Sequence, residues 1–200
     1  RDVASTRPGI ILPQSIYFER NRSLAISADG GYFYAEHRTD FGDFFFQHGI
    51  VNSRANDAEF KHGVVGDLPG KMKGETSWIN RINYEWQGGL VRLAFSFSEL
   101  NFEYAPAPGT INLLPGKFKF NPFVFSFQYN AENWSFTSEY ALRRIRLTDF
   151  GFPDIDRTGE SFYFQGTYQF TSFLQGMVRY DHLVDDRGDR DGKKYAAATG

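Results

Sequence analysis

The sequence predicts an all-β fold, an antiparallel up-and-down transmembrane β-barrel, on the basis of three observations. Several stretches alternate aromatic and polar residues with a period of two, which is the period of a β-strand. The polar positions carry charged side chains, and the connections alternate between short and long. In a membrane barrel, apolar side chains point outward to lipid and polar ones face a wet interior. A soluble sheet would instead bury its apolar face in a core.

The alternation is clearest in three stretches, 78–86, 134–143 and 162–170. Each stretch has one aromatic face and one polar face, because successive side chains of a strand point to opposite sides. We expect the aromatic faces of these stretches and of 117–130 to form the outer surface. The residues concerned are Trp78, Tyr84, Phe125, Phe127, Phe136, Tyr140, Phe164 and Tyr168.

Composition fits a barrel wall but does not decide the fold. Aromatic residues make up 18% of the 200-residue chain, yet the mean hydropathy is −0.46. No run approaches the roughly 18 apolar residues of a membrane-spanning helix. A barrel wall in which every second residue is polar explains this combination, and so does a soluble sandwich with an aromatic core.

Charge and cysteine content exclude several classes of function. The net charge is −2 and no basic cluster suggests binding to a phosphate backbone, which argues against a nucleic-acid partner. The chain has no cysteine, which excludes disulfide scaffolds, zinc sites with thiolate ligands and cysteine nucleophiles.

The first half of the chain contains three predicted strands. Residues 1–21 are irregular, because Pro8 and Pro13 interrupt any strand. A strand at 24–38 ends at the turn signal 40–43, and a second strand follows. A long polar stretch rich in Gly then separates these two strands from the third. The second strand is placed at 44–51, the polar stretch at 52–76 and the third strand at 77–86.

The second half contains five further strands, separated by turn signals. Gly88 and Gly89 are a tight hairpin signal, and Pro and Gly residues crowd the loop at 105–116. Polar turn residues follow at 131–133 and 171–172. The strands are placed at 90–104, 117–130, 134–147, 161–170 and 173–183, so that about eight strands are visible in all.

The connections alternate strictly in length. Short ones lie near residues 41, 88, 132 and 171, whereas long ones occupy 52–76, 105–116, 148–160 and the segment after 183. Outer-membrane barrels show this asymmetry, with short periplasmic turns and long extracellular loops.

Two predicted strands change their apolar face midway. In 90–104, the apolar residues from Val91 to Phe97 occupy odd positions, whereas those from Leu100 to Tyr104 occupy even positions. In 117–130, a matching change occurs near Asn121 and Pro122. Both changes lie toward the same long loop. Either a β-bulge or strands that rise above the bilayer would explain them.

Several segments resemble proteobacterial outer-membrane porin-like proteins. They are RPGIILPQSIY, DFGDFFFQHGIV, YNAENWSFTSEYALRR, GESFYFQGTYQF and VRYDHLVDDRGDRDGKKYAAATG. The resemblance covers most of the chain. It implies a larger parent barrel in the outer membrane of a Gram-negative bacterium, passive diffusion of small hydrophilic or ionic solutes, and a homotrimer in many members. We accordingly expect the chain to be a single β-barrel domain and a fragment of a longer protein.

Charged residues on the polar faces are the first candidate site, because mixed charges inside a pore tune ion selectivity. An alternative is that they pair across strands and only satisfy one another. The basic run Arg143, Arg144 and Arg146 is a candidate for attracting anionic solutes or lipopolysaccharide phosphates, or it forms a solvated rim. The candidate pore-lining residues are Arg81, Glu85, Arg92, Glu139, Arg143, Arg179 and Asp181.

Two further segments are candidate sites. The N-terminal segment, within 1–21, is a candidate pore constriction through Arg7, Ile11 and Tyr17, and its alternative is a disordered leader. The acidic stretch 185–192 lacks the ligand spacing of a helix-loop calcium site, and Arg187 and Arg190 neutralise it, so a solvated extracellular loop is favoured.

Enzyme signatures are absent from the sequence. The four histidines show no metal-ligand spacing, and there is no nucleophile elbow or phosphate loop. We therefore expect no enzymatic activity, no metal and no cofactor. A diffusion channel with outer-membrane lipid as its surroundings is the leading hypothesis. The alternatives are a soluble β-barrel or sandwich that binds an apolar ligand, and a non-conducting structural or adhesive outer-membrane barrel.

Overall fold

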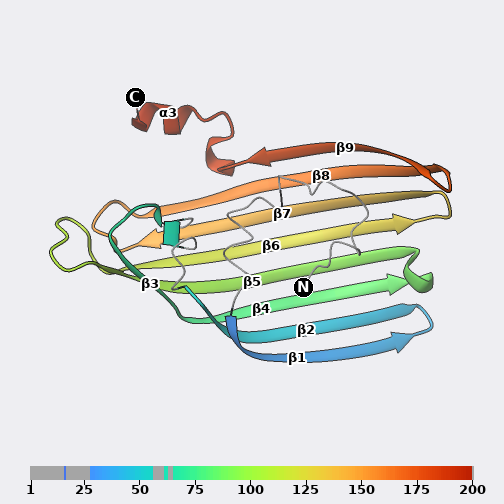
Figure 1. The fold of residues 1–200 in the computed structure, drawn as a ribbon, viewed down its shortest axis with the longest axis horizontal. Coiled ribbons are helices and arrows are strands. Elements are labelled where there is room, and N and C mark those ends of the chain that lie inside the picture. The colour runs from blue at the N-terminus through green and yellow to red at the C-terminus, as the bar shows by residue number, and fades with distance from the viewer. Residues whose placement is uncertain (1–15, 17–27, 56–60, 63–64, 200) are drawn as a thin grey trace.

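A computed structural model describes residue 16 and residues 28–55, 61–62 and 65–199 (Figure 1). Within these residues the protein is all-β, as predicted, and its longest helix is the seven-residue α3 (Lys193–Thr199). Two three-residue 3₁₀ turns, η2 (Gln87–Gly89) and η3 (Arg187–Asp189), complete the helical content beyond residue 65. The strands are β1 (Ala28–Thr39), β2 (Gly42–Ser53), β3 (Gly70–Gly74), β4 (Thr76–Trp86), β5 (Val91–Pro106), β6 (Gly116–Asn130), β7 (Trp134–Thr148), β8 (Ile155–Thr171) and β9 (Leu174–Val184).

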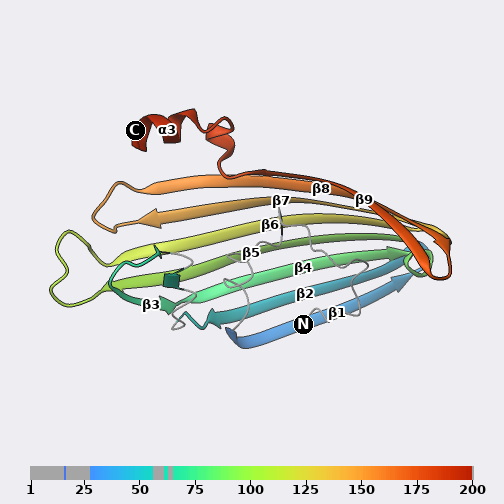
Figure 2. The same ribbon diagram turned by 45° about the horizontal axis from the view of Figure 1, so that its top comes forward.

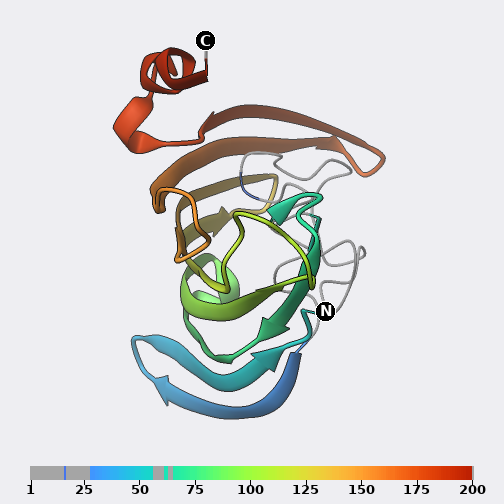
Figure 3. The ribbon, with the colours of Figure 1, turned by 90° about the vertical axis from the view of Figure 1, so that its left-hand side faces the viewer.

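The nine strands form one antiparallel sheet in the order β1-β2-β4-β5-β6-β7-β8-β9, with β3 pairing to β5 (Figure 1). Apart from β3, each strand pairs with the next one along the chain, which confirms the up-and-down topology. The sheet curves into a trough (Figure 3). Its two edges are β1 and β9, and in the described residues no pairing joins them. The described sheet is therefore open, and it is not the closed barrel that the sequence predicts.

Short and long connections lie at opposite ends of the sheet (Figures 1 and 2). The short turns after β1, β4, β6 and β8 share one end, and the long connections share the other. Gly88 and Gly89 have φ angles of +64° and +92°, a backbone conformation that glycine adopts without steric cost. The predicted alternation of connection lengths is confirmed.

Two element boundaries were predicted wrongly. The stretch 52–76 is not wholly a loop, because it contains β3, which pairs with the far end of β5. Lysine and glycine dominate β3, so its sequence lacks the aromatic alternation that marks the other strands. The loop predicted at 148–160 is also shorter, because β8 begins at Ile155. Charged residues at the start of β8 conceal the strand.

Gly74 lies where the backbones of β2 and β3 approach each other closely. A Cβ atom at this position would lie 1.8 Å from the carbonyl oxygen of Ser53. We expect Gly74→Ala to lower the free energy of unfolding by about 1–3 kcal/mol, the usual cost of overpacking. The matched control is Gly31→Ala, because a Cβ at Gly31 would meet nothing within 4 Å. Urea unfolding curves for the two variants would contradict the prediction if their midpoints coincided.

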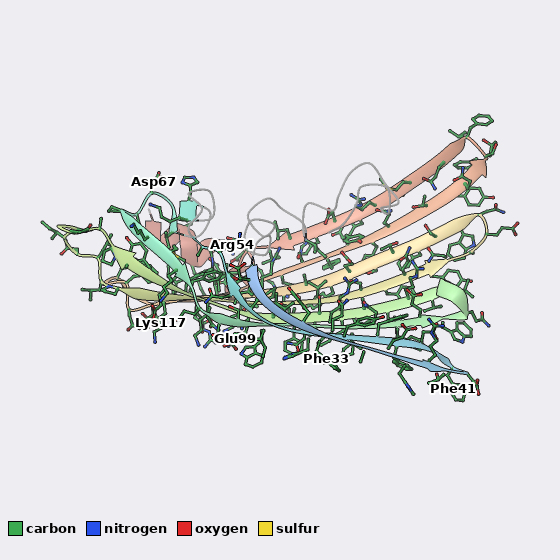
Figure 4. All side chains as sticks on the ribbon, turned by 60° about the horizontal axis from the view of Figure 1, so that its bottom comes forward. Phe33, Phe41, Arg54, Asp67, Glu99 and Lys117 are labelled. Carbon is green, nitrogen blue, oxygen red and sulfur yellow. The ribbon has the colours of Figure 1, made fainter. Side chains whose placement is uncertain are left out.

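The sheet has two chemically distinct faces. We call the convex side the outer face and the side that carries the connection between β2 and β3 the inner face. Figure 4 shows Phe33, Glu99 and Lys117 on the outer face and Asp67 on the opposite side. All other residues are assigned to a face from the strand register, since directly paired residues share a face.

A packed aromatic core fills the inner face near the long connections. Phe102, Tyr104, Phe118 and Phe120 are buried there together with Phe150, and Val65 and Leu68 pack against them. The pairing of β5 with β6 and of β6 with β7 keeps one register throughout. No bulge therefore causes the change of apolar face. The aromatic residues change faces because, at this end of the sheet, side chains on the inner face are buried in a core that excludes water.

Candidate functional site

An exposed apolar band covers the outer face nearer the short turns. The eight residues expected on the outer surface all share this face by register, as predicted. Phe125 retains 41% of its accessible surface and Val178 retains 79%. Besides Phe125 and Val178, the exposed apolar residues of the band include Phe33, Phe44, Phe46, Ile50, Trp78, Ile82, Trp86, Phe97, Trp134, Phe164, Tyr168 and Tyr180.

The length of the band matches a transmembrane strand. On β7 it runs over nine residues, from Trp134 to Leu142, and a tilted transmembrane β-strand needs about 9–11 residues. The apolar band of outer-membrane barrels is about 25 Å tall and is flanked by aromatic girdles. Trp and Tyr side chains gather at the short-turn end of the band, where the rings of Tyr129 and Trp134 lie 5.0 Å apart.

The inner face opposite this band is polar. By register it carries all seven of the candidate pore-lining residues. Four of them, Arg81, Glu85, Arg92 and Glu139, line a hollow of about 290 Å³ between β4 and β7. Ala94 lies in this hollow between the larger polar side chains. Asn83, Ser126, Gln128 and Thr137 are among the other lining residues.

The charges of the hollow are partly paired. Glu85 and Arg92 stand directly opposite each other, with 3.3 Å between a carboxylate oxygen and Nε of the arginine. Ser126 donates a hydrogen bond of 2.9 Å to Glu139, which is buried. Arg81 is exposed and its Nε donates to Asn83 at 2.9 Å. In the part of the chain that the structure describes, Arg81 forms no ion pair.

The other three candidate residues lie outside the hollow. Arg143 retains only 5% of its accessible surface. Arg179 donates to Gln165 at 3.0 Å from Nε, and its guanidinium lies 5.8 Å from the ring centre of Tyr163. Asp181 is exposed and faces Tyr163 across β8 and β9. The seven candidate residues therefore differ in environment, since Arg143 is packed into the wall and Arg81 is exposed.

One residue of the predicted constriction is described. Ile16 is buried against Ala141 and Tyr163 on the inner face, and Val124 packs beside them. Arg7, Ile11 and Tyr17 lie outside the described residues. Ala141 and Tyr163 were not selected from the sequence, because a small residue and a tyrosine on a polar face carry no functional signal of their own.

The basic run at the end of β7 is divided between the two faces. Arg143 points to the inner face, whereas Arg144 and Arg146 lie on the outer face beyond the apolar band. Arg144 binds both carboxylate oxygens of Asp156, at 2.8 and 2.5 Å. This guanidinium lowers the pKa of the Asp156 carboxyl from its usual value. The carboxylate therefore stays ionised beside the arginines.

The acidic stretch 185–192 forms ion pairs. Arg187 and Arg190 both reach Glu160, a buried carboxylate that also accepts a hydrogen bond of 2.8 Å from the Tyr140 hydroxyl. Asp186 caps η3 by accepting from the backbone N–H of Gly188 at 2.8 Å. Across the described ranges, no group of His, Cys, Asp and Glu side chains is arranged to hold a metal ion.

Among the residues that the structure describes, no helix is long and apolar enough to cross a membrane. Protein-family models, curated proteins and solved structures give no match to the chain, and the interpretation of the two faces rests on their chemistry.

Proposed function

We propose that this chain forms part of the wall of an outer-membrane porin-like β-barrel, through which small hydrophilic or ionic solutes diffuse passively. The observation that carries the proposal is the opposed chemistry of the two faces. A continuous band of exposed Phe, Trp and Tyr lies on the outer face, and the inner face opposite this band carries charged and other polar side chains. Soluble monomers rarely expose an apolar patch as extensive as this one. Contact with lipid hydrocarbon removes the cost of that exposure.

Closure of the sheet is the second part of the proposal. In hydrocarbon, every backbone N–H and C=O must find a hydrogen-bond partner, so an open sheet edge is not stable there. The edges β1 and β9 therefore require further strands in a bilayer. A closed barrel of about eight strands has an interior filled by side chains. We accordingly place the sheet in a larger barrel, and the homotrimer implied by the resemblance is part of the same proposal.

The proposed solute path runs along the inner face. The hollow with Arg81, Glu85 and Arg92 supplies a polar surface with charges of both signs. The contact of Ile16 with Ala141 and Tyr163 supports a constriction by the N-terminal segment at a neighbouring level of the wall. No bound cofactor and no covalent chemistry are required for diffusion.

A second candidate function is a structural barrel that does not conduct. The aromatic core around Phe102 and Phe118 favours it, because this core occupies the inner face near the long connections. Planar-bilayer conductance separates the two candidates. A soluble protein that binds an apolar ligand is not favoured, because the described sheet exposes its apolar face along its whole width and does not enclose it.

The charge in the hollow provides a direct test of the channel. We expect Arg81→Gln to move the reversal potential in a salt gradient toward cation selectivity, because Arg81 faces open space on the inner face. Arg144→Gln is the matched control, since it removes the same charge from the outer face. Absence of conductance in the unmodified protein, or equal shifts in the two variants, would contradict the channel.

A further inference from the structure

A group of four basic side chains lies on the outer face directly beyond the apolar band. We call Lys117, Lys119, Arg144 and Arg146 the outer cation patch. Lys117 and Lys119 come from β6, and Arg144 and Arg146 come from β7. Lys119 stands directly opposite Arg146, and Figure 4 shows Lys117 on this face.

The protein itself neutralises the patch only in part. Both oxygens of Asp156 are bound by Arg144, although Asp156 stands opposite Arg146. Lys119 has Asn101 on its other side, which carries no charge. Lys117 stands opposite Glu103, whereas neither Lys119 nor Arg146 forms an ion pair within the described chain. Like charges that face each other across two strands are destabilising, so this pair favours an external anion.

The height of the patch indicates which anion it meets. The apolar band ends at Phe123 on β6 and at Leu142 on β7. Lys119 lies four residues beyond Phe123, or about 13 Å along the strand at roughly 3.3 Å per residue. If the band lies in hydrocarbon, the patch therefore lies at the level of the lipid head groups. Ammonium and guanidinium groups at that level attract lipid phosphates.

We propose that the outer cation patch binds the phosphate group of membrane-lipid head groups in the leaflet at the long-connection end, with Lys119 and Arg146 as its central pair. This inference rests on the proposed membrane function. A solute inside the proposed pore does not reach the patch, because the sheet separates the outer face from the inner face. Lys117 and Arg144 flank the central pair, but Lys117 stands opposite Glu103 and Arg144 is bound by Asp156, so these two cations already have internal counter-charges.

The test measures binding of defined lipids to the full chain folded in neutral-detergent micelles. Phosphatidic acid is the probe, and phosphatidylcholine and inorganic phosphate are run in parallel, with thermal stabilisation giving the apparent Kd. We expect the variant Lys119→Gln with Arg146→Gln to bind phosphatidic acid about 30-fold more weakly. This corresponds to about 1 kcal/mol for each cation near a lipid surface.

Two further variants separate binding from folding. Lys61→Gln with Arg157→Gln removes the same charge from the inner side at the same end, and we expect it to bind like the unmodified protein. Lys119→Arg with Arg146→Lys keeps the charges and should retain binding. Heat-modifiable gel mobility reports whether each variant is folded. Neutralising the central pair should not impair folding in neutral detergent, because it removes a repulsion.

Each outcome has a definite meaning. Equal weakening of phosphatidic acid binding in the outer-face variant (Lys119→Gln with Arg146→Gln) and in the inner-side variant (Lys61→Gln with Arg157→Gln) would overturn the inference. It would show a nonspecific effect of net charge. Equal stabilisation by inorganic phosphate at the same concentration would overturn the assignment to lipid. Flotation with vesicles of phosphatidylcholine alone tests the membrane function separately. If the protein floats with these vesicles but phosphatidic acid adds no stability, only the present inference fails.

Discussion

Replacing Phe125 with arginine is expected to prevent stable insertion into a bilayer, whereas the same replacement at the adjacent Ser126 is expected to be tolerated. Phe125 lies on the outer face in the middle of the apolar band, where an arginine costs about 2–4 kcal/mol in a membrane barrel. Ser126 points into the polar hollow and contacts Glu139, which an arginine at this position would face.

The two variants introduce the same residue at adjacent positions of β6, so the change in net charge is matched. Folding into phosphatidylcholine vesicles, followed by urea titration, measures the difference in free energy of unfolding. In a soluble protein the order would be reversed or lost, because Phe125 is already exposed and an arginine there would contact water. Equal tolerance of arginine at both positions would therefore remove the basis for the proposed membrane function.

Replacing Phe102 with alanine is expected to lower the free energy of unfolding by about 3–5 kcal/mol, the usual cost of truncating a buried phenylalanine. Phe102 retains 0% of its accessible surface, and its ring centre lies 5.6 Å from that of Phe118. The matched control is Glu103→Ala, which truncates the next residue of β5 on the exposed outer face. Comparable losses in the two variants would show that the inner aromatic core does not stabilise this end of the sheet.

The strands and their order could be predicted because each signal is local. Period-two alternation and a turn signal such as Gly88 and Gly89 lie within a few residues of the strands they define. The sequence does not predict β3 because its Lys and Gly residues lack the aromatic alternation of the other strands. The strand becomes evident only from its pairing with β5. Closure of the barrel could not be predicted from local patterns, because pairing between the edge strands β1 and β9 is a long-range property, and in the described sheet these two strands do not pair with each other.

The faces of the candidate site were predictable, but the environments of its residues were not. Parity alone places Arg81 and Arg143 on one face, and the structure agrees. That Arg143 is buried and Arg81 exposed depends on what packs over each position, which a strand pattern does not encode. Parity also separates Arg143 from Arg144. Adjacent arginines of one strand therefore do not form a single basic group.

The neighbour-to-neighbour pairing of the strands makes the hairpin the unit by which this sheet changes size. Removal of β1 and β2 would leave the pairs from β4 to β9 intact and would create a new edge at β4. Duplication of a hairpin such as β6 and β7 would widen the curved wall without breaking an existing pair. A chain of this design can therefore evolve toward a wider or narrower sheet by gain or loss of hairpins. The exception is the stretch around β3, whose partner β5 also pairs with β4 and β6, so this part of the wall must be kept as a unit.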